Sequence, residues 1–244
     1  DAVREYNVLG HTYGAEYGKR AGGQITVVTT SGTNQLHGSA FEFLRNNKLD
    51  ARNFFSTTED APPFKRNQFG GSLGGPILRD KMFLFGNYEG FRERLGVDTV
   101  AVVPSFEARQ GRLPNYLLPG GSRTSPDAGV YAPVPNLVPG ILPFFRYWPE
   151  SNGEELLQNG LPTGAAYHRS NPTRRVQEDF GLARCDYNLS SRDSLSTSFT
   201  ADKGRRDEPG DTPNFVTQVN QSLYALSAQE THIFSPTVLN IATF

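Results

Sequence analysis

Histidines and paired carboxylates are the groups in this chain whose types could build a catalytic or metal site. The four histidines have no His-x-x-x-His or His-Glu pairing, so their spacing predicts no metal site. The Gly-x-Ser-x-Gly run from Gly70 to Gly74 lies inside a predicted strand and no helical pattern follows it, so it does not predict the nucleophile elbow of a serine hydrolase. The adjacent pairs Glu59-Asp60 and Glu154-Glu155 lie in loop-like sequence, which is typical of solvated surface. We therefore predict no catalytic residue, no bound metal and no cofactor.

A glycine-rich run from Gly70 to Gly75 has the composition of a phosphate-binding loop. It lacks the Gly-Lys-Ser/Thr ending of such loops, and no helical pattern follows it. The run therefore does not predict nucleotide binding.

Four aromatic side chains form the remaining cluster with binding chemistry: Phe144, Phe145, Tyr147 and Trp148. Exposed aromatic rings could stack on a sugar or cover a hydrophobic solute. The alternative is that these rings fold their own segment together or pack it onto the rim of the neighbouring sheet. The sequence leaves both interpretations open.

Composition limits the classes of protein to which the chain could belong. Its 24 Lys and Arg residues balance 25 Asp and Glu residues, so no basic field predicts a nucleic-acid partner. The 17 Phe, 10 Tyr, 25 Gly and 17 Pro residues favour strands, turns and long loops. The single Cys185 excludes an intrachain disulfide. No apolar run in the sequence is long enough to form a transmembrane helix.

Strand-like segments must position these residues, because β-branched and aromatic residues recur in short alternating runs. Several of the runs are long enough to cross a bilayer as tilted strands. The predicted strands are Gln24–Thr30, His37–Arg45, Asn67–Ile77, Met82–Arg92, Val176–Leu189, Ser194–Lys203, Asn220–Ile233 and Val238–Phe244.

Connections between these strands alternate between long and short. Tight turns are predicted at 78–81, 190–193 and 234–237, and long connections at 46–66, 93–175 and 204–219. An outer-membrane barrel has this rhythm because its periplasmic turns are short and its extracellular loops are long. A soluble β-sandwich has less reason to follow it.

Alternation inside the strands separates an apolar from a polar face, as a barrel wall requires. One strand places Leu195, Thr197 and Phe199 opposite Ser194, Ser196, Ser198 and Thr200. The long segment Leu95–Thr173 is rich in Pro and Gly and is predicted to be irregular. A short helix is expected in it near Ser105–Arg112 or Gly153–Gln158.

Three blocks of sequence carry a family resemblance. They are GGQITVVTTSGTN from Gly22, HGSAFEFLRN from His37 and DKMFLFGNYEGFR from Asp80. The blocks resemble the TonB-dependent outer-membrane transporters, in the subgroup that carries an N-terminal carboxypeptidase-regulatory-like domain. The resemblance is dense from Glu16 to Arg92, absent through the long segment and moderate after Val176.

The resemblance implies an all-β fold: a partial antiparallel transmembrane β-barrel preceded by the C-terminal end of a plug domain, with long extracellular loops. Residues 1–35 are expected to form the end of the plug. Residues 36–244 are expected to form the first part of the barrel, about seven strands of about 22, with a long extracellular loop at about 93–175. The chain starts without Met or a signal peptide and stops inside a strand-like pattern, so we expect an internal piece of a longer protein.

Function also follows from the resemblance: TonB-dependent uptake of a scarce solute across the bacterial outer membrane, without enzymatic activity. The implied solutes are a siderophore, another metal complex or an oligosaccharide. The implied partners are the TonB complex, through an N-terminal segment outside this chain, and outer-membrane lipid and lipopolysaccharide, but no nucleic acid. Gly22, Gly23 and Gly32 are expected to form a plug-to-barrel hinge, in which Gly22-Gly23 supply backbone freedom because glycine tolerates positive φ. The alternative is a secreted or surface β-sandwich for adhesion or carbohydrate binding.

Overall fold

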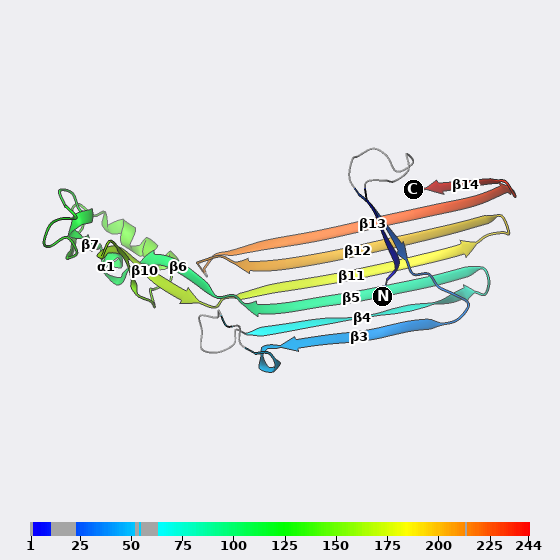
Figure 1. The fold of residues 1–244 in the computed structure, drawn as a ribbon, viewed down its shortest axis with the longest axis horizontal. Helices are drawn as coiled ribbons and strands as arrows, with labels where there is room; N and C mark the ends of the chain where they lie inside the picture. Colours follow the sequence, from blue (N-terminus) through cyan, green and yellow to red (C-terminus); the bar gives the residue numbers. More distant parts are fainter. Residues whose placement is uncertain (1, 11–22, 52–53, 55–62, 213) are drawn as a thin grey trace.

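Extended strands dominate the computed structural model, which describes residues 2–10, 23–51, 54, 63–212 and 214–244 (Figure 1). The short helical segments are η2 (Asn47–Leu49), α1 (Phe106–Arg109), η3 (Asn115–Leu117) and η4 (Pro139–Tyr147). The strands are β1 (Val3–Leu9), β2 (Gln24–Thr29), β3 (His37–Asn46), β4 (Phe64–Leu78), β5 (Met82–Gly96), β6 (Thr99–Pro104), β7 (Arg112–Pro114), β8 (Tyr131–Pro133), β9 (Glu155–Gln158), β10 (Leu161–Ser170), β11 (Thr173–Asn188), β12 (Asp193–Pro209), β13 (Val216–Ser235) and β14 (Val238–Thr243).

Seven of these strands form one sheet, which we call the wall. Its order is β14-β13-β12-β11-β5-β4-β3, and every neighbouring pair is antiparallel. Strands that follow one another along the chain therefore lie side by side, except that an insertion separates β5 from β11. Each strand predicted from the sequence is present, whereas β1 and the strands of the insertion were not predicted.

The two ends of the wall differ as the loop rhythm predicted. One end, the turn end, carries the short connections at 78–81, 188–193 and 235–238, and the opposite loop end carries the insertion (Figure 1). The predicted long connection at 204–219 is wrong, because β12 and β13 stay paired up to Pro209 and Val216. The charged stretch before Pro209 has the composition of a loop, but its backbone groups continue the ladder and its charges pair locally.

Side-chain alternation gives the wall two chemically different faces. Directly paired residues point to the same side of a sheet, so the strand registers define rows that run across the wall. On one side, the outer face, three successive rows contain no charged residue between β4 and β13. These rows are Leu73, Gly86, Ala183, Phe199 and Leu226; Gly71, Tyr88, Gly181, Ala201 and Tyr224; and Gly75, Leu84, Cys185, Thr197 and Ala228.

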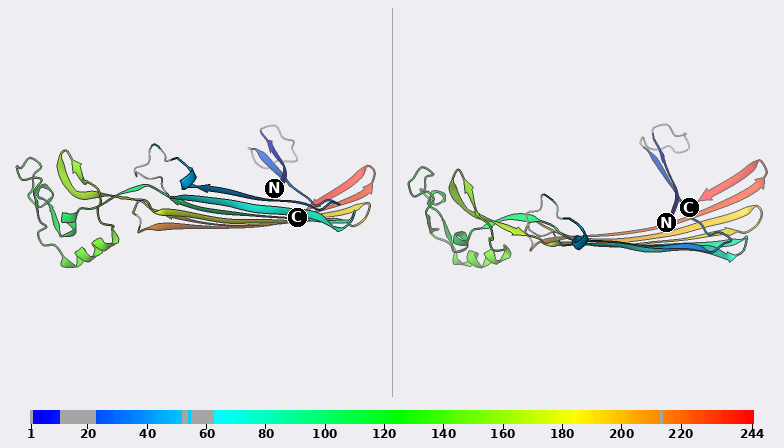
Figure 2. Two further views of the ribbon diagram at one scale, coloured as in Figure 1. Left: turned by 90° about the horizontal axis from the view of Figure 1, so that it is seen from below. Right: turned by 60° about the horizontal axis from the view of Figure 1, so that its bottom comes forward.

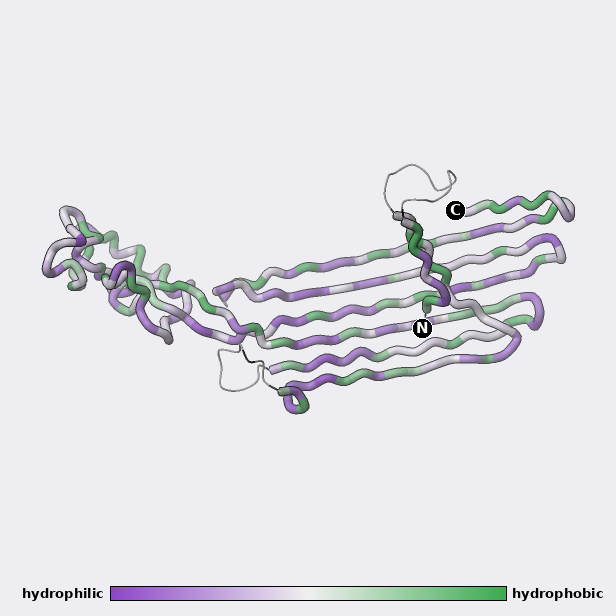
Figure 3. The backbone as a smooth tube through the Cα atoms, viewed as in Figure 1, coloured by the Kyte–Doolittle hydropathy of each residue, from purple (hydrophilic) through white to green (hydrophobic). Residues whose placement is uncertain are grey.

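The opposite, inner face is polar along β12, where Ser194, Ser196, Ser198 and Thr200 lie in line, and mixed on β5 and β11, where Phe85, Phe91, Phe180 and Leu182 share it with charged residues. Apolar and polar residues therefore alternate along the strands (Figure 3). Leu226 is 74% exposed and Phe199 is 46% exposed. A soluble sheet would cover such side chains, whereas a barrel wall presents them to lipid.

Strands β1 and β2 pair as a separate antiparallel hairpin that stands on the inner face (Figure 2). The hairpin continues into the wall through residues 30–36, and the amide of Thr30 donates to the carbonyl of Ala2 at 2.9 Å. No second sheet of comparable size covers the wall in the part of the chain that the structure describes. This arrangement does not match the β-sandwich alternative.

The insertion between β5 and β11 is a folded unit, which we call the loop hairpin (residues 97–172). Its arms β6 and β10 pair with each other beyond the end of the wall. Its own core consists of small side chains and one tyrosine: Ala101, Val103, Ala108, Tyr116, Ala128 and Ala166. Helix α1 confirms the prediction near Ser105–Arg112, where Ser105 accepts a hydrogen bond from the amide of Ala108. The alternative helix position at 153–158 is wrong, because strand β9 pairs there with β10.

Among the described residues, no helix has the length and apolar composition required to span a membrane.

Candidate functional site

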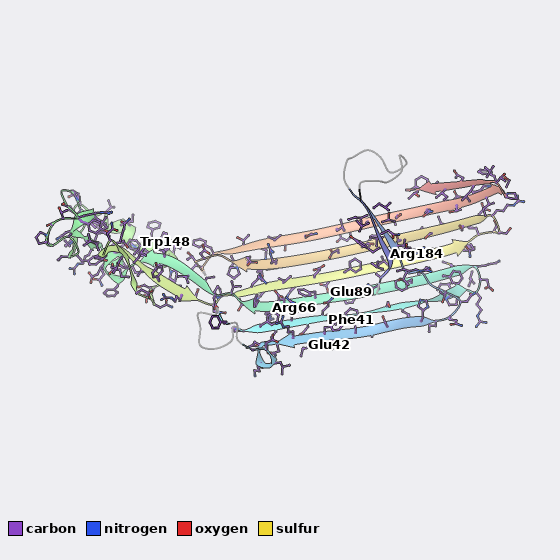
Figure 4. All side chains as sticks on the ribbon, in the orientation of Figure 1. Phe41, Glu42, Arg66, Glu89, Trp148 and Arg184 are labelled. Carbon is purple, nitrogen blue, oxygen red and sulfur yellow. The ribbon has the colours of Figure 1, made fainter. Side chains whose placement is uncertain are left out.

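A hollow of about 400 Å³ lies where the β1–β2 hairpin meets the wall. Its lining comes from both parts of the structure: Ala2, Val3, Gln68, Glu89, Gly90, Phe91, Glu178 and Phe180. Side chains from β4, β5 and β11 reach it because Gln68 pairs with Phe91, which pairs with Glu178, and this row points to the inner face. Figure 4 shows Glu89 in the middle of the wall, close to where the hairpin crosses.

The chemistry of this hollow combines acceptors with apolar rings. Glu89 and Glu178 supply carboxylate oxygens, Gln68 supplies an amide, and Phe91 and Phe180 supply ring faces. Such a set can accept hydrogen bonds from hydroxyl or amino groups while the rings cover the apolar side of a solute. Sequence reasoning missed these residues because the distances between them along the chain carry no motif.

The hairpin is joined to the wall by Arg184 of β11 (Figure 4). Its guanidinium donates to the carbonyl of Thr29 at 2.9 Å and to the hydroxyl of Thr29 at 2.8 Å. Asp186 orients the same guanidinium at 2.9 Å and accepts a hydrogen bond from Ser196 at 2.7 Å. One side chain of the wall therefore fixes the last residue of β2.

The linker after β2 is bound to the turn end of the wall. The side chain of Asn34 donates to the carboxylate of Asp80 at 2.6 Å and accepts from the amide of Asp80 at 2.9 Å. Asp80 lies in the β4–β5 turn with φ of 61°, in the left-handed region that Asp tolerates better than most residues. The Ser-Gly-Thr-Asn block in the sequence thus contains an anchor that the sequence alone did not identify.

Of the three glycines predicted to form the hinge, Gly32 has the clearest structural role. It is buried, and an added Cβ would lie 2.6 Å from the carbonyl oxygen of Leu84 and 2.9 Å from that of Gly75. Gly32 therefore allows the linker to approach the wall backbone closely. Gly23 does not have positive φ, so the expected reason is wrong for this glycine; Gly22 lies outside the described residues.

The four predicted aromatic residues lie on the loop hairpin, far along the molecule from the hollow (Figure 4). Phe144 and Tyr147 are in ring contact at 6.2 Å between centroids and, like Trp148, are more than two-fifths exposed. Phe145 is half-buried and lines a second hollow of about 580 Å³ with residues of α1 and η4. The cluster therefore divides into three exposed rings and one inward ring.

Arg109 of α1 holds the backbone of this aromatic segment. Its guanidinium donates to the carbonyl of Phe145 at 3.0 Å, to that of Trp148 at 2.9 Å and to that of Pro149. Asn214, in the β12–β13 connection, donates to the carbonyl of Tyr147 at 2.9 Å. The backbone is fixed by these polar contacts, so Phe144, Tyr147 and Trp148 remain exposed to solvent.

Electrostatics in the loop hairpin are local. The guanidinium of Arg169 beside Glu154 lowers the pKa of that carboxyl to about 2, at N–O distances of 2.6 and 2.8 Å. Burial raises the pKa of Glu155, whose carboxylate accepts a hydrogen bond from the hydroxyl of Tyr131. The two adjacent carboxylates therefore have different environments, and the chain shows no geometry that would pair them for catalysis.

One group of described residues, Asp193, Glu230 and His232 at the turn end, has the atom types and spacing of a cation site. His232 is already hydrogen-bonded to Asp193 and packs edge-on against Phe234, with ring centroids 4.3 Å apart. These contacts account for the position of His232 without an ion.

Comparison with known proteins places this geometry in a family. The model of the outer membrane beta barrel domain matches residues 28–244. The chain is also 35% identical over 92 residues to the "TonB-dependent transporter Oar" of Myxococcus xanthus. That alignment covers 35% of this chain and 9% of the relative, so the chain spans only a small part of its length. No solved structure matches the chain.

Proposed function

Because the chain belongs to the outer membrane beta barrel domain family, we propose that it forms part of a transporter that takes up a scarce solute with energy supplied through TonB. The protein is located in the bacterial outer membrane, and the partial similarity to a TonB-dependent transporter supports transport as its function. The observation that carries the proposal is the β1–β2 hairpin, which lies against the polar face of a wall whose other face is apolar.

The proposal assigns residues 1–35 to the end of a plug and residues 36–244 to the first strands of a barrel of about 22 strands. The loop end then faces the environment, and the long loop at about 93–175 contains the loop hairpin. A plug inside the barrel blocks passive flow, so uptake requires that the plug moves relative to the wall. Gly22, Gly23 and Gly32 form the proposed hinge for that movement, and Arg184 and Asn34 are the contacts that resist it.

Two regions of the described structure are suited to bind the solute. The exposed rings of Phe144, Tyr147 and Trp148 would contact it first, and Phe145 would contribute through the second hollow that it lines. The hollow with Glu89 and Glu178 would bind it next, against the hairpin. Carboxylates and rings suit a solute that carries hydroxyl or amino groups, which includes a siderophore, another metal complex or an oligosaccharide.

Uptake by the full-length protein tests the proposal. A strain without the gene would be complemented with the wild-type gene or with a Glu89→Ala/Glu178→Ala variant. Transport of a radiolabelled iron–siderophore complex and of a radiolabelled oligosaccharide would then be measured with and without TonB. We expect uptake of one probe to require both TonB and the two carboxylates. Equal uptake with and without TonB would exclude the proposed energy source.

The matched control is Glu42→Ala, which removes one carboxylate from the outer face of β3. It should leave uptake unchanged, since a residue outside the lumen does not meet the solute. A loss of uptake equal to that of the double variant would show that the hollow is not the site.

A further inference from the structure

Strand β6 lies at one edge of the three-stranded sheet of the loop hairpin, beyond the loop end of the wall (Figure 1). The order of this sheet is β6-β10-β9, so among the described residues a strand pairs with β6 on one side only. An edge strand presents unpaired backbone N–H and C=O groups along its other side, and another chain can pair with them. We call this side of β6 the free edge.

The free edge continues an edge that is paired in the wall. Gly96, the last residue of β5, pairs with Thr173 of β11. Thr99, the first residue of β6, pairs with Ser170 of β10 in the same register, so β6 extends β5 without a shift. On the opposite side of β5, the amide of Gly96 donates to the carbonyl of Pro63 at 2.7 Å, next to the start of β4. No described strand continues the line of β4 beyond this point. The free edge therefore suits a strand antiparallel to β6, as β4 is antiparallel to β5.

Backbone alternation identifies Val100 and Val102 as the residues whose peptide groups point to the free edge. In an antiparallel ladder, successive residues direct their N–H and C=O groups to opposite sides. The amides of Val97 and Ser105 donate to carbonyls of the opposite arm, at 3.0 and 2.9 Å, so the odd-numbered residues of β6 face β10. At the end of the strand, the carbonyl of Pro104 already accepts a hydrogen bond from a side chain of α1. Within the described part of the chain, the unused groups are therefore those of the two valines.

Strand β6 lacks the features by which proteins prevent an edge strand from pairing with another chain. Those features are charged side chains, an internal proline, a bulge or a very short strand. The sequence of β6, TVAVVP, has no charge, and its only proline is its last residue. Strand β9, at the other edge of the same sheet, is shorter, contains Glu155 and pairs with β10 irregularly. This difference between the two edges indicates that β6 is available for pairing.

Side chains of β6 define the chemistry of the strand that fits beside it. Val100 and Val102 are 47% and 54% exposed and point to the same side of the sheet, whereas Ala101 and Val103 are buried on the other side. A strand added at the free edge would place alternate residues beside the exposed valines, where β-branched side chains pack well. Only an extended polypeptide repeats N–H and C=O groups at the spacing of the edge, so a lipid or a sugar does not match it.

We propose that β6 binds an extended segment of an extracellular protein, which adds to the free edge as an antiparallel strand and carries β-branched residues at alternate positions. The inference rests on the orientation given under the proposed function, in which the loop end faces the environment. It assigns protein recognition to the loop hairpin, at a surface separate from the hollow beside the β1–β2 hairpin.

The test uses the full-length protein in detergent and a fluorescently labelled peptide of alternating threonine and valine, as long as β6. A second peptide has the same side chains but is N-methylated at every residue, which removes its backbone donors. Binding of both peptides would be measured by fluorescence anisotropy.

Two matched variants locate the binding. Val102→Lys places a charge on β6, and the control Leu157→Lys places the same charge on β9, where Leu157 is 60% exposed. Unchanged hydrogen exchange in β10 would show that the loop hairpin of each variant is folded. If Val102→Lys does not fold, Val100→Lys gives the same test.

We expect Leu157→Lys to bind the unmodified peptide as the wild type does, and Val102→Lys to bind it at least about tenfold more weakly. The N-methylated peptide should bind the wild type at least about tenfold more weakly than the unmodified peptide, because it cannot complete the ladder. The proposal is overturned if the wild type does not bind the unmodified peptide, if both peptides bind equally, or if both lysine variants weaken binding equally.

Other occupants of the free edge are outcomes of the same set of measurements. Slow hydrogen exchange at the amides of Val100 and Val102 without peptide would mean that another segment of the full-length protein covers the edge. Self-association in analytical ultracentrifugation that Val102→Lys abolishes would assign the edge to a second copy of the protein. Either result would overturn the proposal of a separate protein partner.

Failure of this proposal is distinguishable from failure of the proposed function, because peptide binding needs neither TonB nor a solute. A protein that binds the peptide at β6 but takes up no solute would support the free edge as a binding site and contradict the proposed transport alone.

Discussion

The wall and the loop hairpin are both built from antiparallel strands, yet they bury their side chains in opposite ways. The loop hairpin is small but has its own core, with Val103 only 1% exposed. The wall is larger, and Phe85 and Leu182 are the buried hydrophobic residues among its described strands, while Phe199 and Leu226 are exposed. A soluble unit must cover its apolar residues with its own chain, whereas a membrane wall leaves that role to lipid on one side.

This contrast explains why the two regions differ in their sequence patterns. The wall needs regular alternation, because its faces meet two solvents of different polarity. The loop hairpin stands in water and needs turns, caps and small residues that allow a compact core. The loop hairpin has described glycines with positive φ at 111, 120, 160 and 164, whereas no described glycine of the wall has positive φ.

The largest effect should come from a charge placed on the outer face of the wall. Phe199→Arg should destabilise the full-length protein in lipid vesicles by about 2–4 kcal/mol, because the guanidinium would lie in the apolar band. Urea titration of vesicle-inserted protein measures the change. The control Ser198→Arg, one residue away on the inner face, should cost much less. Equal costs would contradict the assignment of the two faces.

The contact between linker and wall gives the next prediction. Gly32→Ala should destabilise the protein by about 1–3 kcal/mol, because the added Cβ would lie 2.6 Å from the carbonyl oxygen of Leu84. The control is Gly140→Ala in the loop hairpin, where no atom lies within 4 Å of the added Cβ, and it should change stability by less than about 0.5 kcal/mol. Thermal unfolding of both variants measures these changes in stability. An unchanged stability of Gly32→Ala would refute the close approach of the linker to the wall.

Core packing of the loop hairpin can be tested separately from the wall. Val103→Ala should weaken the hairpin by about 1–2 kcal/mol through lost burial and a small cavity. Hydrogen exchange should accelerate in residues 99–170 and stay unchanged in β12 and β13. Val102→Ala is the control on the same strand, since Val102 is 54% exposed. Faster exchange throughout the wall would show that the two regions unfold together.

The smallest effect should come from the ion pair between Glu154 and Arg169. The pKa of Glu154 is lowered from 4.5 to about 2, so the stabilisation is complete above about pH 4.5 and is lost as the pH falls through about 2. At pH 6, hydrogen exchange of the loop hairpin should therefore be slower in the wild type than in Glu154→Gln. Below a pH of about 2 the two proteins should exchange at the same rate.

The control for this pair is Glu150→Gln, a neighbouring exposed carboxylate that forms no ion pair within the described residues. It should show no such pH dependence. If the difference in exchange rate between wild type and Glu154→Gln grows as the pH falls, the predicted pH dependence of the ion pair is wrong.

The wall can be predicted from local sequence patterns. Residues such as Leu195, Thr197 and Phe199 alternate with serines, and this local period fixes both the strand and its two faces. Strands joined by short turns pair as antiparallel neighbours, so the strand order of the wall can also be predicted from the sequence. Strand ends were predicted less well, because the charged residues before Pro209 have the composition of a loop but continue the ladder in water.

The candidate sites, in contrast, depend on contacts between distant strands. Glu89 and Glu178 meet in one hollow because β5 and β11, which are distant along the chain, are paired in a particular register. The core of the loop hairpin likewise brings Val103 and Ala166 together across more than sixty residues of irregular sequence. Periodicity is a local property of the chain, whereas register and long-range contact depend on the balance of many weak interactions, which local sequence does not encode.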